Sequence, residues 1–269
     1  MASDLPATPL SRARKRFGQH FLRDPAIVQR IVNCVAVDEG ETVVEIGPGR
    51  GALTGLLASC GAQLHLVEID RELAGDLTMR YAEAPAVTVH AGDVLHFDFT
   101  ALAGQLNTRL VLVGNLPYNI ASPLLIGLLS VLDCVDRAIF MLQREVAQRL
   151  AAMPGSRDYG RLTVMVSRLC TVEILFDVRP GAFRPPPKVD STLVRLCPRI
   201  APLGPPVDSQ AYSQVVRTAF SQRRKTLRNS LRSYHPDLAF EEAGIDPGTR
   251  PETLSATQFA QLTAALYQD

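Results

Sequence analysis

Short apolar runs alternate with amphipathic stretches along the first two thirds of the chain. The runs are rich in Val, Ile and Leu and have the length of buried strands; they span residues 42–46, 63–68, 87–90, 110–114 and 138–142. Patterns of helical period occupy residues 25–36, 52–59, 72–81 and 122–132. Continuous apolar strands separated by helices are typical of a parallel sheet that is covered on both faces. The pattern predicts a doubly wound, mostly parallel α/β domain.

The pattern changes after this region. Helices are predicted at residues 144–153 and 161–170, and closing strands at residues 171–178 and 191–196. The two strands flank FRPPPK, in which three prolines restrict the backbone to a rigid turn.

A proline-rich linker, PRIAPLGPP, then leads into a segment with helical patterns only. This segment includes Ser255 with Gln258 three residues later, the spacing of a capping box. We therefore expect an α/β domain over residues 1–200, with a basic amino-terminal arm over residues 1–24, and a small all-α domain over residues 201–269.

The composition agrees with a globular intracellular protein. A hydrophobic content of 46% allows a full core, and the longest apolar stretch, residues 120–132, is shorter than the roughly 20 residues that cross a bilayer. The five cysteines are scattered and odd in number, so they predict neither a disulfide framework nor a metal site. The amino terminus lacks the apolar core of a secretory signal. Its Arg and Ser content also occurs in organelle transit peptides, but a cytoplasmic location fits the whole chain better.

Positive charge is concentrated in two places although the net charge is only +1. Residues 215–235 contain six basic side chains and no acid: Arg217, Arg223, Arg224, Lys225, Arg228 and Arg232. A second cluster lies near the amino terminus: Arg12, Arg14, Lys15 and Arg16. An isolated cluster is usually a solvated face, whereas two clusters on a nearly neutral chain favour a polyanionic partner.

The segment VVEIGPGRGALT places Gly47, Gly49 and Gly51 in the turn between the first strand and its helix. Glycines at this position allow the backbone to approach a ligand closely, and the helix that follows offers unpaired amides. Together with Ala52 the motif also satisfies the dinucleotide fingerprint GxGxxG/A. A tight structural turn, a nicotinamide site and an S-adenosylmethionine site all remain open on this motif alone.

Two carboxylates follow at the ends of the next strands. Glu68 lies about 20 residues after Gly47, where a carboxylate can accept both hydroxyls of a ribose. Asp93 ends the third strand and could accept a hydrogen bond from an adenine amino group, or could simply cap the next turn. Open α/β sheets bind ligands beyond the carboxyl ends of their strands, which favours one shared site.

The fourth strand ends in NLPY, residues 115–118, which has the form of the (Asp/Asn)-Pro-Pro-Tyr motif of enzymes that methylate exocyclic amino groups. An adenine N6 is a poor nucleophile because its lone pair is delocalised. The Asn115 side-chain oxygen and the Leu116 carbonyl, held open by Pro117, could bind its two hydrogens and align the nitrogen with a methyl donor. Tyr118 would supply a ring for stacking of the base.

Together with these motifs, RKRFGQHFL, VEID, LQREVAQRL, YGRL, FRPPPKVDS and FSQRRKTLRNSL extend the match from about Arg14 to the carboxyl terminus. In these motifs and their order, the chain resembles the bacterial small-subunit ribosomal RNA adenine dimethyltransferases. The resemblance implies a Rossmann-like methyltransferase fold and S-adenosylmethionine as methyl donor. It also implies, as acceptors, two adjacent adenosines in the 3′-terminal hairpin of 16S rRNA, which are converted to N6,N6-dimethyladenosine in the small (30S) subunit late in its assembly. Alignment of N6 by the NLPY acceptors requires no metal.

The resemblance also implies roles for individual residues. The cofactor would be bound by His20, Leu22, Gly47, Gly49, Glu68, Asp93 and Asn115. The target adenine would be held by residues 115–118, with Phe183 stacking on its other face. The two basic clusters, rather than the resemblance, indicate the residues that would bind the rRNA: Arg14, Lys15, Arg16, Arg223, Arg224, Lys225 and Arg228.

His20 departs from the family pattern, in which many members have Asn. A contact through the backbone would be unaffected, whereas a side-chain contact would depend on tautomer and pH.

Three other functions remain as alternatives: a 23S rRNA methyltransferase of the macrolide-resistance type, an assembly checkpoint factor whose methylation is secondary, and a nicotinamide dehydrogenase, for which no proton donor is evident. Nothing in the sequence suggests more than a monomer.

Overall fold

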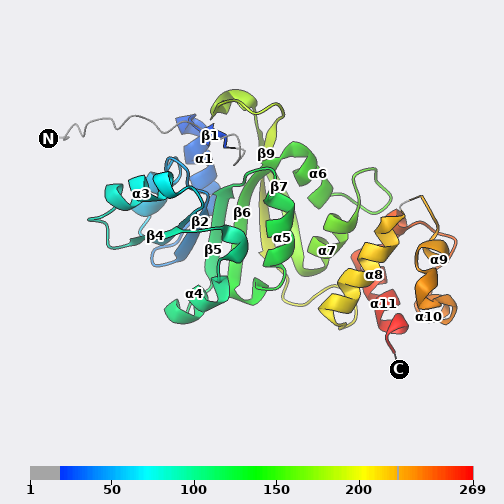
Figure 1. Cartoon of the computed structure of the whole chain (residues 1–269). Helices are drawn as coiled ribbons and strands as arrows, with labels where there is room; N and C mark the ends of the chain where they lie inside the picture. The colour runs from blue at the N-terminus through cyan, green and yellow to red at the C-terminus, as the bar shows by residue number, and fades with distance from the viewer. Residues whose placement is uncertain (1–18, 223, 269) are drawn as a thin grey trace.

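The computed structural model describes residues 19–222 and 224–268 (Figure 1). Its centre is a seven-stranded sheet of order β4-β3-β2-β5-β6-β9-β7. The strands are β2 (Thr42–Ile46), β3 (Gln63–Glu68), β4 (Val87–Ala91), β5 (Leu110–Asn115), β6 (Val135–Gln143), β7 (Cys170–Val178) and β9 (Ser191–Pro198). The first five are parallel to one another, while β9 pairs antiparallel with both β6 and β7.

The register of the central strands brings their carboxyl ends to one edge. Ile46 at the end of β2 lies opposite Val67 of β3 and Gly114 of β5, and Glu68 lies opposite Ala91 of β4. All residues of β2 are buried, as its mostly apolar and β-branched sequence predicts. The segments that leave these strands are therefore neighbours in space.

Helices cover both faces of the sheet. On one face Val43, Leu64 and Val111 pack with the helices α1 (Pro25–Val35), α2 (Thr54–Ser59) and α3 (Arg71–Arg80). On the other face Val44 and Leu112 pack with α4 (Phe99–Leu106), α5 (Ala121–Leu128), α6 (Arg144–Leu150) and α7 (Arg161–Leu169). The prediction of a doubly wound, mostly parallel sheet is confirmed.

The chain after β9 is helical and forms α8 (Ser209–Ser221), α9 (Leu227–Ser230), α10 (Asp237–Glu242) and α11 (Ala256–Leu266). In Figure 1 these helices lie together beside α7, at the end of the molecule opposite β4. They share a third core with Tyr159, Val164 and Met165 from the α7 region. The predicted capping box is present, because Ser255 and Gln258 bond each other's backbone amides at the start of α11. The division into domains at residue 200 stays a prediction.

Several elements differ from the sequence-based expectations. The helix α4 was not expected, and a two-stranded sheet joins β1 (Phe21–Leu22) to β8 (Phe183–Arg184). The helix α5 ends at Leu128 rather than near residue 132, because the chain turns into a short 3-10 helix over Leu132–Cys134 and enters β6 earlier than expected. Within the described ranges, no helix has the length and apolar character needed to cross a bilayer.

Candidate active site

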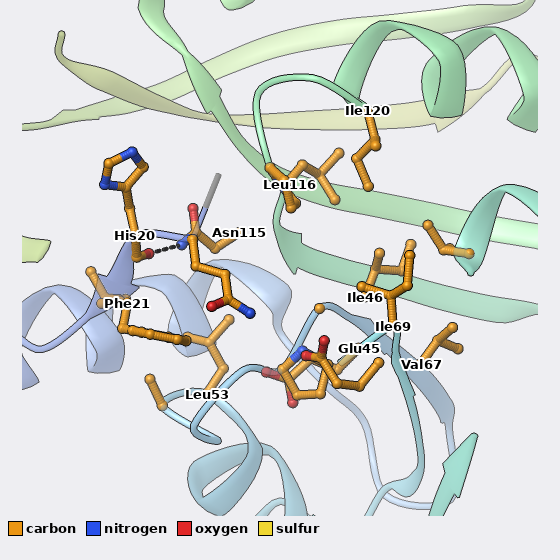
Figure 2. A pocket seen from close by; sticks show the side chains of 18 of the residues that line it. His20, Phe21, Glu45, Ile46, Leu53, Val67, Ile69, Asn115, Leu116 and Ile120 are labelled. Carbon is orange, nitrogen blue, oxygen red and sulfur yellow. Dashed lines mark hydrogen bonds between the residues drawn. The ribbon is translucent and has the colours of Figure 1, made fainter. Parts of the chain in front are cut away.

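A cavity of about 270 Å³ lies at the carboxyl ends of β2, β3, β4 and β5 (Figure 2). Its walls come from the glycine turn after β2, the ends of β3 and β4, and the NLPY segment after β5. Residues 19–22, from the segment that contains β1, close the remaining side. The structure thus brings together in one cavity the segments that the sequence predicted at one sheet edge.

The glycine turn is shaped by positive backbone angles. Gly47 has a φ of +63°, and a Cβ built there would meet no heavy atom within 4 Å, so it would only occupy open space. Gly49 has a φ of +58°, and its Cβ would lie 3.0 Å from a ring carbon of Phe21. Gly47 lines the cavity, whereas Gly49 lies behind the lining and lets β1 approach the turn. Each glycine is therefore needed for a different reason.

Glu68 is held by main-chain donors. Its Oε2 accepts the N–H of Gly49 at 2.9 Å, and its Oε1 accepts the N–H of Asp70 at 2.9 Å. Burial raises the pKa of this carboxyl, although the two N–H groups oppose the rise. Each carboxylate oxygen keeps a lone pair, so Glu68 can still accept hydroxyl groups from a ligand in the cavity.

Glu45 is a cavity residue that the sequence analysis missed. It lies within β2, two residues before Gly47, and burial raises its pKa to about 7, with the Thr54 hydroxyl opposing the rise through a 2.7 Å bond. Glu68 adds a smaller unfavourable charge interaction. The acid inside an otherwise apolar strand was a visible signal, because a buried carboxylate in such a run needs a partner. Two carboxyl groups together favour a cationic ligand.

Asp93 has a structural role that the sequence left open as an alternative. Its Oδ1 accepts the N–H of Leu95 at 3.0 Å and so caps the 3-10 helix Val94–His96. Asp93 also lines the cavity. The other carboxylate oxygen, Oδ2, lies 3.6 Å from Nδ1 of His96, and its contact with a ligand stays a prediction.

Asn115 is fixed by the amino-terminal segment. Its Nδ2 donates to the main-chain oxygen of His20 at 2.8 Å, as the dashed line in Figure 2 shows. This bond uses the amide nitrogen and thereby leaves Oδ1 as the side-chain acceptor. Next to it the Leu116 side chain is 1% exposed and anchors the turn, while Pro117 and Tyr118 line the cavity. His20 therefore acts on Asn115 through its backbone.

The pairing of β1 with β8 places Leu22 opposite Phe183. Leu22 lines the cavity, but Phe183 is 5% exposed, packs in the core on the α1 side of the sheet, and lies outside the cavity lining. Direct stacking of Phe183 on a base would require this side chain to move. That role stays a prediction.

The described residues include only part of the predicted RNA-binding set. Arg14, Lys15, Arg16 and Arg223 lie outside the described residues. Arg224, Lys225 and Arg228 are exposed around the start of α9. Arg228 forms an ion pair with Asp237 of α10 at 3.2 Å, an acid that the sequence window around the cluster did not include.

All five cysteines are free thiols. Across residues 19–222 and 224–268 no group of three or more His, Cys, Asp or Glu side chains is arranged to hold a metal ion.

A mostly parallel sheet with a glycine turn after β2 and NLPY after β5 defines a Rossmann-like methyltransferase. More specifically, the chain belongs to the ribosomal RNA adenine dimethylase family, whose model matches residues 10–268. The resemblance seen in the sequence motifs is confirmed.

Relatives match along nearly the whole chain. Ribosomal RNA small subunit methyltransferase A of Nitrosococcus oceani is 50% identical over 252 residues, which cover 94% of this chain and 95% of that protein. The protein of the same name from Pseudomonas aeruginosa is 47% identical over 255 residues, 95% of each chain.

Two solved structures have a similar fold. A dimethyladenosine transferase from Plasmodium falciparum superposes with a TM-score of 0.77 at 26% identity, covering 90% of this chain and 96% of that one. The 23S rRNA methyltransferase ErmE superposes with a TM-score of 0.68 at 29% identity, covering 92% of this chain and 100% of that one.

Proposed function

We propose that this protein transfers methyl groups from S-adenosylmethionine to N6 of two adjacent adenosines in the 3′-terminal hairpin of 16S rRNA. The product is N6,N6-dimethyladenosine at both positions, formed in the cytoplasm on the small ribosomal subunit late in its assembly. Support comes from the family and from relatives, about half identical in sequence, that are named small subunit methyltransferases.

The cavity has the features that the methyl donor requires. S-adenosylmethionine supplies an electrophilic methyl group on a positively charged sulfur. The open space at Gly47 admits a ligand against the backbone, and the carboxyl groups of Glu45 and Glu68 favour its positive charge. Glu68 would accept the ribose hydroxyls, and Asp93 would accept the adenine amino group of the cofactor. His20 and Leu22 would contact the cofactor from the cavity wall, and Gly49 would shape the pocket from behind this wall.

The orientation of Asn115 is the observation that carries the proposal. Because Nδ2 is bound to the His20 carbonyl, Oδ1 can accept one N6 hydrogen of the target adenine, and the Leu116 carbonyl can accept the other. These two acceptors localise the lone pair on N6 and direct it towards the methyl group. The step needs alignment rather than a strong base.

The exposed cations around α9 would bind the rRNA. Arg224, Lys225 and Arg228 would contact phosphates, which position the substrate without reading its sequence. Arg14, Lys15, Arg16 and Arg223, which lie outside the described residues, are also proposed to bind rRNA. The target adenosine would leave its stack to enter the cavity of a monomeric enzyme.

A 23S rRNA methyltransferase is less well supported, because this chain is 29% identical in sequence to ErmE and 50% identical to the small-subunit enzyme of Nitrosococcus oceani.

The proposal is tested by incubating undermethylated small and large subunits with labelled S-adenosylmethionine and identifying the modified nucleosides by mass spectrometry. Dimethyladenosine at two adjacent positions near the 3′ end of 16S rRNA is expected. Label found only in large-subunit RNA would contradict the substrate, and rRNA binding without any transfer would favour the checkpoint role.

A further inference from the structure

The Tyr118 ring is contacted by two segments that are distant from it in sequence. Its hydroxyl lies 3.3 Å from the hydroxyl of Ser191, the first residue of β9. Its ring centroid lies 5.5 Å from that of the His20 imidazole, with the two planes inclined by 32°. The ring separation is that of a direct aromatic contact. The hydroxyl separation is longer than the usual range of about 2.5–3.0 Å for an O–H···O hydrogen bond, so the two hydroxyls form a weak hydrogen bond.

Both contacting groups are themselves fixed. Ser191 is 1% exposed and pairs with Gln143 of β6 and with Val178 of β7, so its backbone is held by the sheet on both sides. The His20 ring is anchored to the FRPPPK segment, because its Nδ1 donates to the Pro185 carbonyl at 2.8 Å. A carbonyl can only accept, so this bond requires the hydrogen to be on Nδ1.

We propose that Ser191 and the His20 ring are positioning residues that set the orientation of the Tyr118 ring. The inference rests on the proposed function, in which the target adenine stacks on that ring. Ser191 holds the hydroxyl end, and the His20 ring limits rotation about the bond that joins the ring to the backbone. The same segment that orients the Asn115 amide through the His20 carbonyl therefore also orients Tyr118 through the His20 side chain.

Alignment of the base is what such a contact would change. Displacement of a reacting group by about 1 Å can lower the rate by about 100-fold. Loss of one of the two restraints should displace the Tyr118 ring by less than about 1 Å. We expect a decrease of about tenfold in kcat, with the cofactor site intact.

A double-mutant cycle isolates the Ser191 contact. Ser191→Ala and Tyr118→Phe each remove one hydroxyl of the same pair and leave the backbone unchanged. Each should lower kcat by about tenfold on undermethylated small subunits, and the double variant should lose no more than the worse single variant. Ser191→Thr, which keeps a hydroxyl, should restore most of the rate, and the Kd for S-adenosylmethionine should stay within about twofold in all variants.

Thr192 provides a matched control on the same strand. It is also 1% exposed, and its hydroxyl donates to Asp177 at 2.6 Å rather than to the cavity. Thr192→Val should lower thermal stability but leave kcat within about twofold of wild type. For the second restraint, His20→Asn can keep a donor for Pro185 but loses the ring contact, and should lower kcat by a few-fold.

Three results would overturn the inference. The first is a wild-type kcat in Ser191→Ala. The second is a decrease of kcat in the double variant that equals the product of the two single decreases, because the two hydroxyls would then act independently. If Ser191→Ala fails to fold, Tyr118→Phe decides alone, and an unchanged kcat refutes the contact. Absence of transfer by the wild-type enzyme would be recognised separately, because it refutes the proposed function and this inference with it.

Discussion

The strand-end cavity and the basic surface around α9 place their functional groups in opposite physical settings. In the cavity, Asn115 and Glu68 are wholly or partly buried and are bonded to groups from other segments. Around α9, Arg224 and Lys225 are exposed, and the ion pair of Arg228 with Asp237 leaves more than half of each side chain accessible. Buried groups are oriented before a ligand arrives, while exposed charges act through a field that salt screens. Changes in the two regions should therefore affect different measured quantities.

Asn115→Ala should give the largest effect and tests the role of the buried groups in the cavity. It removes the acceptor for N6, so we expect kcat to fall by about 100- to 1,000-fold, with the Kd for subunits unchanged. Asn115→Asp separates orientation from acceptance, because it keeps an acceptor but loses the donor to the His20 carbonyl. It should also lose most activity. Wild-type turnover in Asn115→Asp would show that the bond to His20 is dispensable.

Gly49→Ala should weaken cofactor binding by more than tenfold. The new Cβ would lie 3.0 Å from the Phe21 ring at a φ of +58°, and the left-handed backbone costs about 1–2 kcal/mol for a residue with a side chain. Isothermal titration with S-adenosylmethionine measures the loss. The matched control is Gly75→Ala within α3, where a Cβ would meet nothing within 4 Å and the variant should bind normally. Equal affinity in the two variants would contradict the account of the turn.

Arg224→Ala combined with Lys225→Ala tests the other region. Loss of two exposed charges should weaken subunit binding by about tenfold at low salt and reduce the slope of log Kd against log salt by about one or two. The cofactor Kd should not change. Arg71→Ala removes an exposed charge from α3 and serves as control. A salt dependence that stays the same in the double variant would exclude these residues from the RNA surface.

The smallest expected effect is a pH dependence of cofactor binding. The Glu45 pKa is raised by burial to about 7, and a bound cation would lower it, so binding should release protons. If the decrease is about one pH unit, affinity should rise about fivefold between pH 6 and pH 8. Glu45→Gln keeps an acceptor for Thr54 and should remove most of this rise, leaving the part due to Glu68. If wild type and Glu45→Gln show the same pH dependence of cofactor affinity, Glu45 is not the group that releases the proton.

The sequence predicted the parts of the molecule that depend on local pattern. β2 and β3 have the expected limits, because each is a mostly apolar run that is buried almost throughout. The two-residue strands β1 and β8 are too short for any periodicity and exist only because residues 21–22 meet residues 183–184. The helix α5 was expected to be longer, since apolar content alone does not mark where a helix ends.

The site was predictable in its residue types but not in its contacts. Gly47, Glu68 and NLPY could be assigned to one sheet edge because parallel strands share that edge. The bond between Asn115 and the His20 carbonyl joins residues 95 apart and uses a backbone atom, so no side-chain pattern in the sequence predicts it. Phe183 illustrates the reverse case: a motif suggested a cavity residue, and the fold buries it in the core.

The most direct test of the account is a crystal structure with S-adenosylhomocysteine and a short RNA that contains the target adenosine. The account predicts the Asn115 Oδ1 at about 3 Å from N6 of the base, with Nδ2 still bound to the His20 carbonyl. An adenine bound away from NLPY, or an Asn115 amide turned so that Nδ2 faces the base, would contradict the central claim that a preset acceptor aligns the nucleophile.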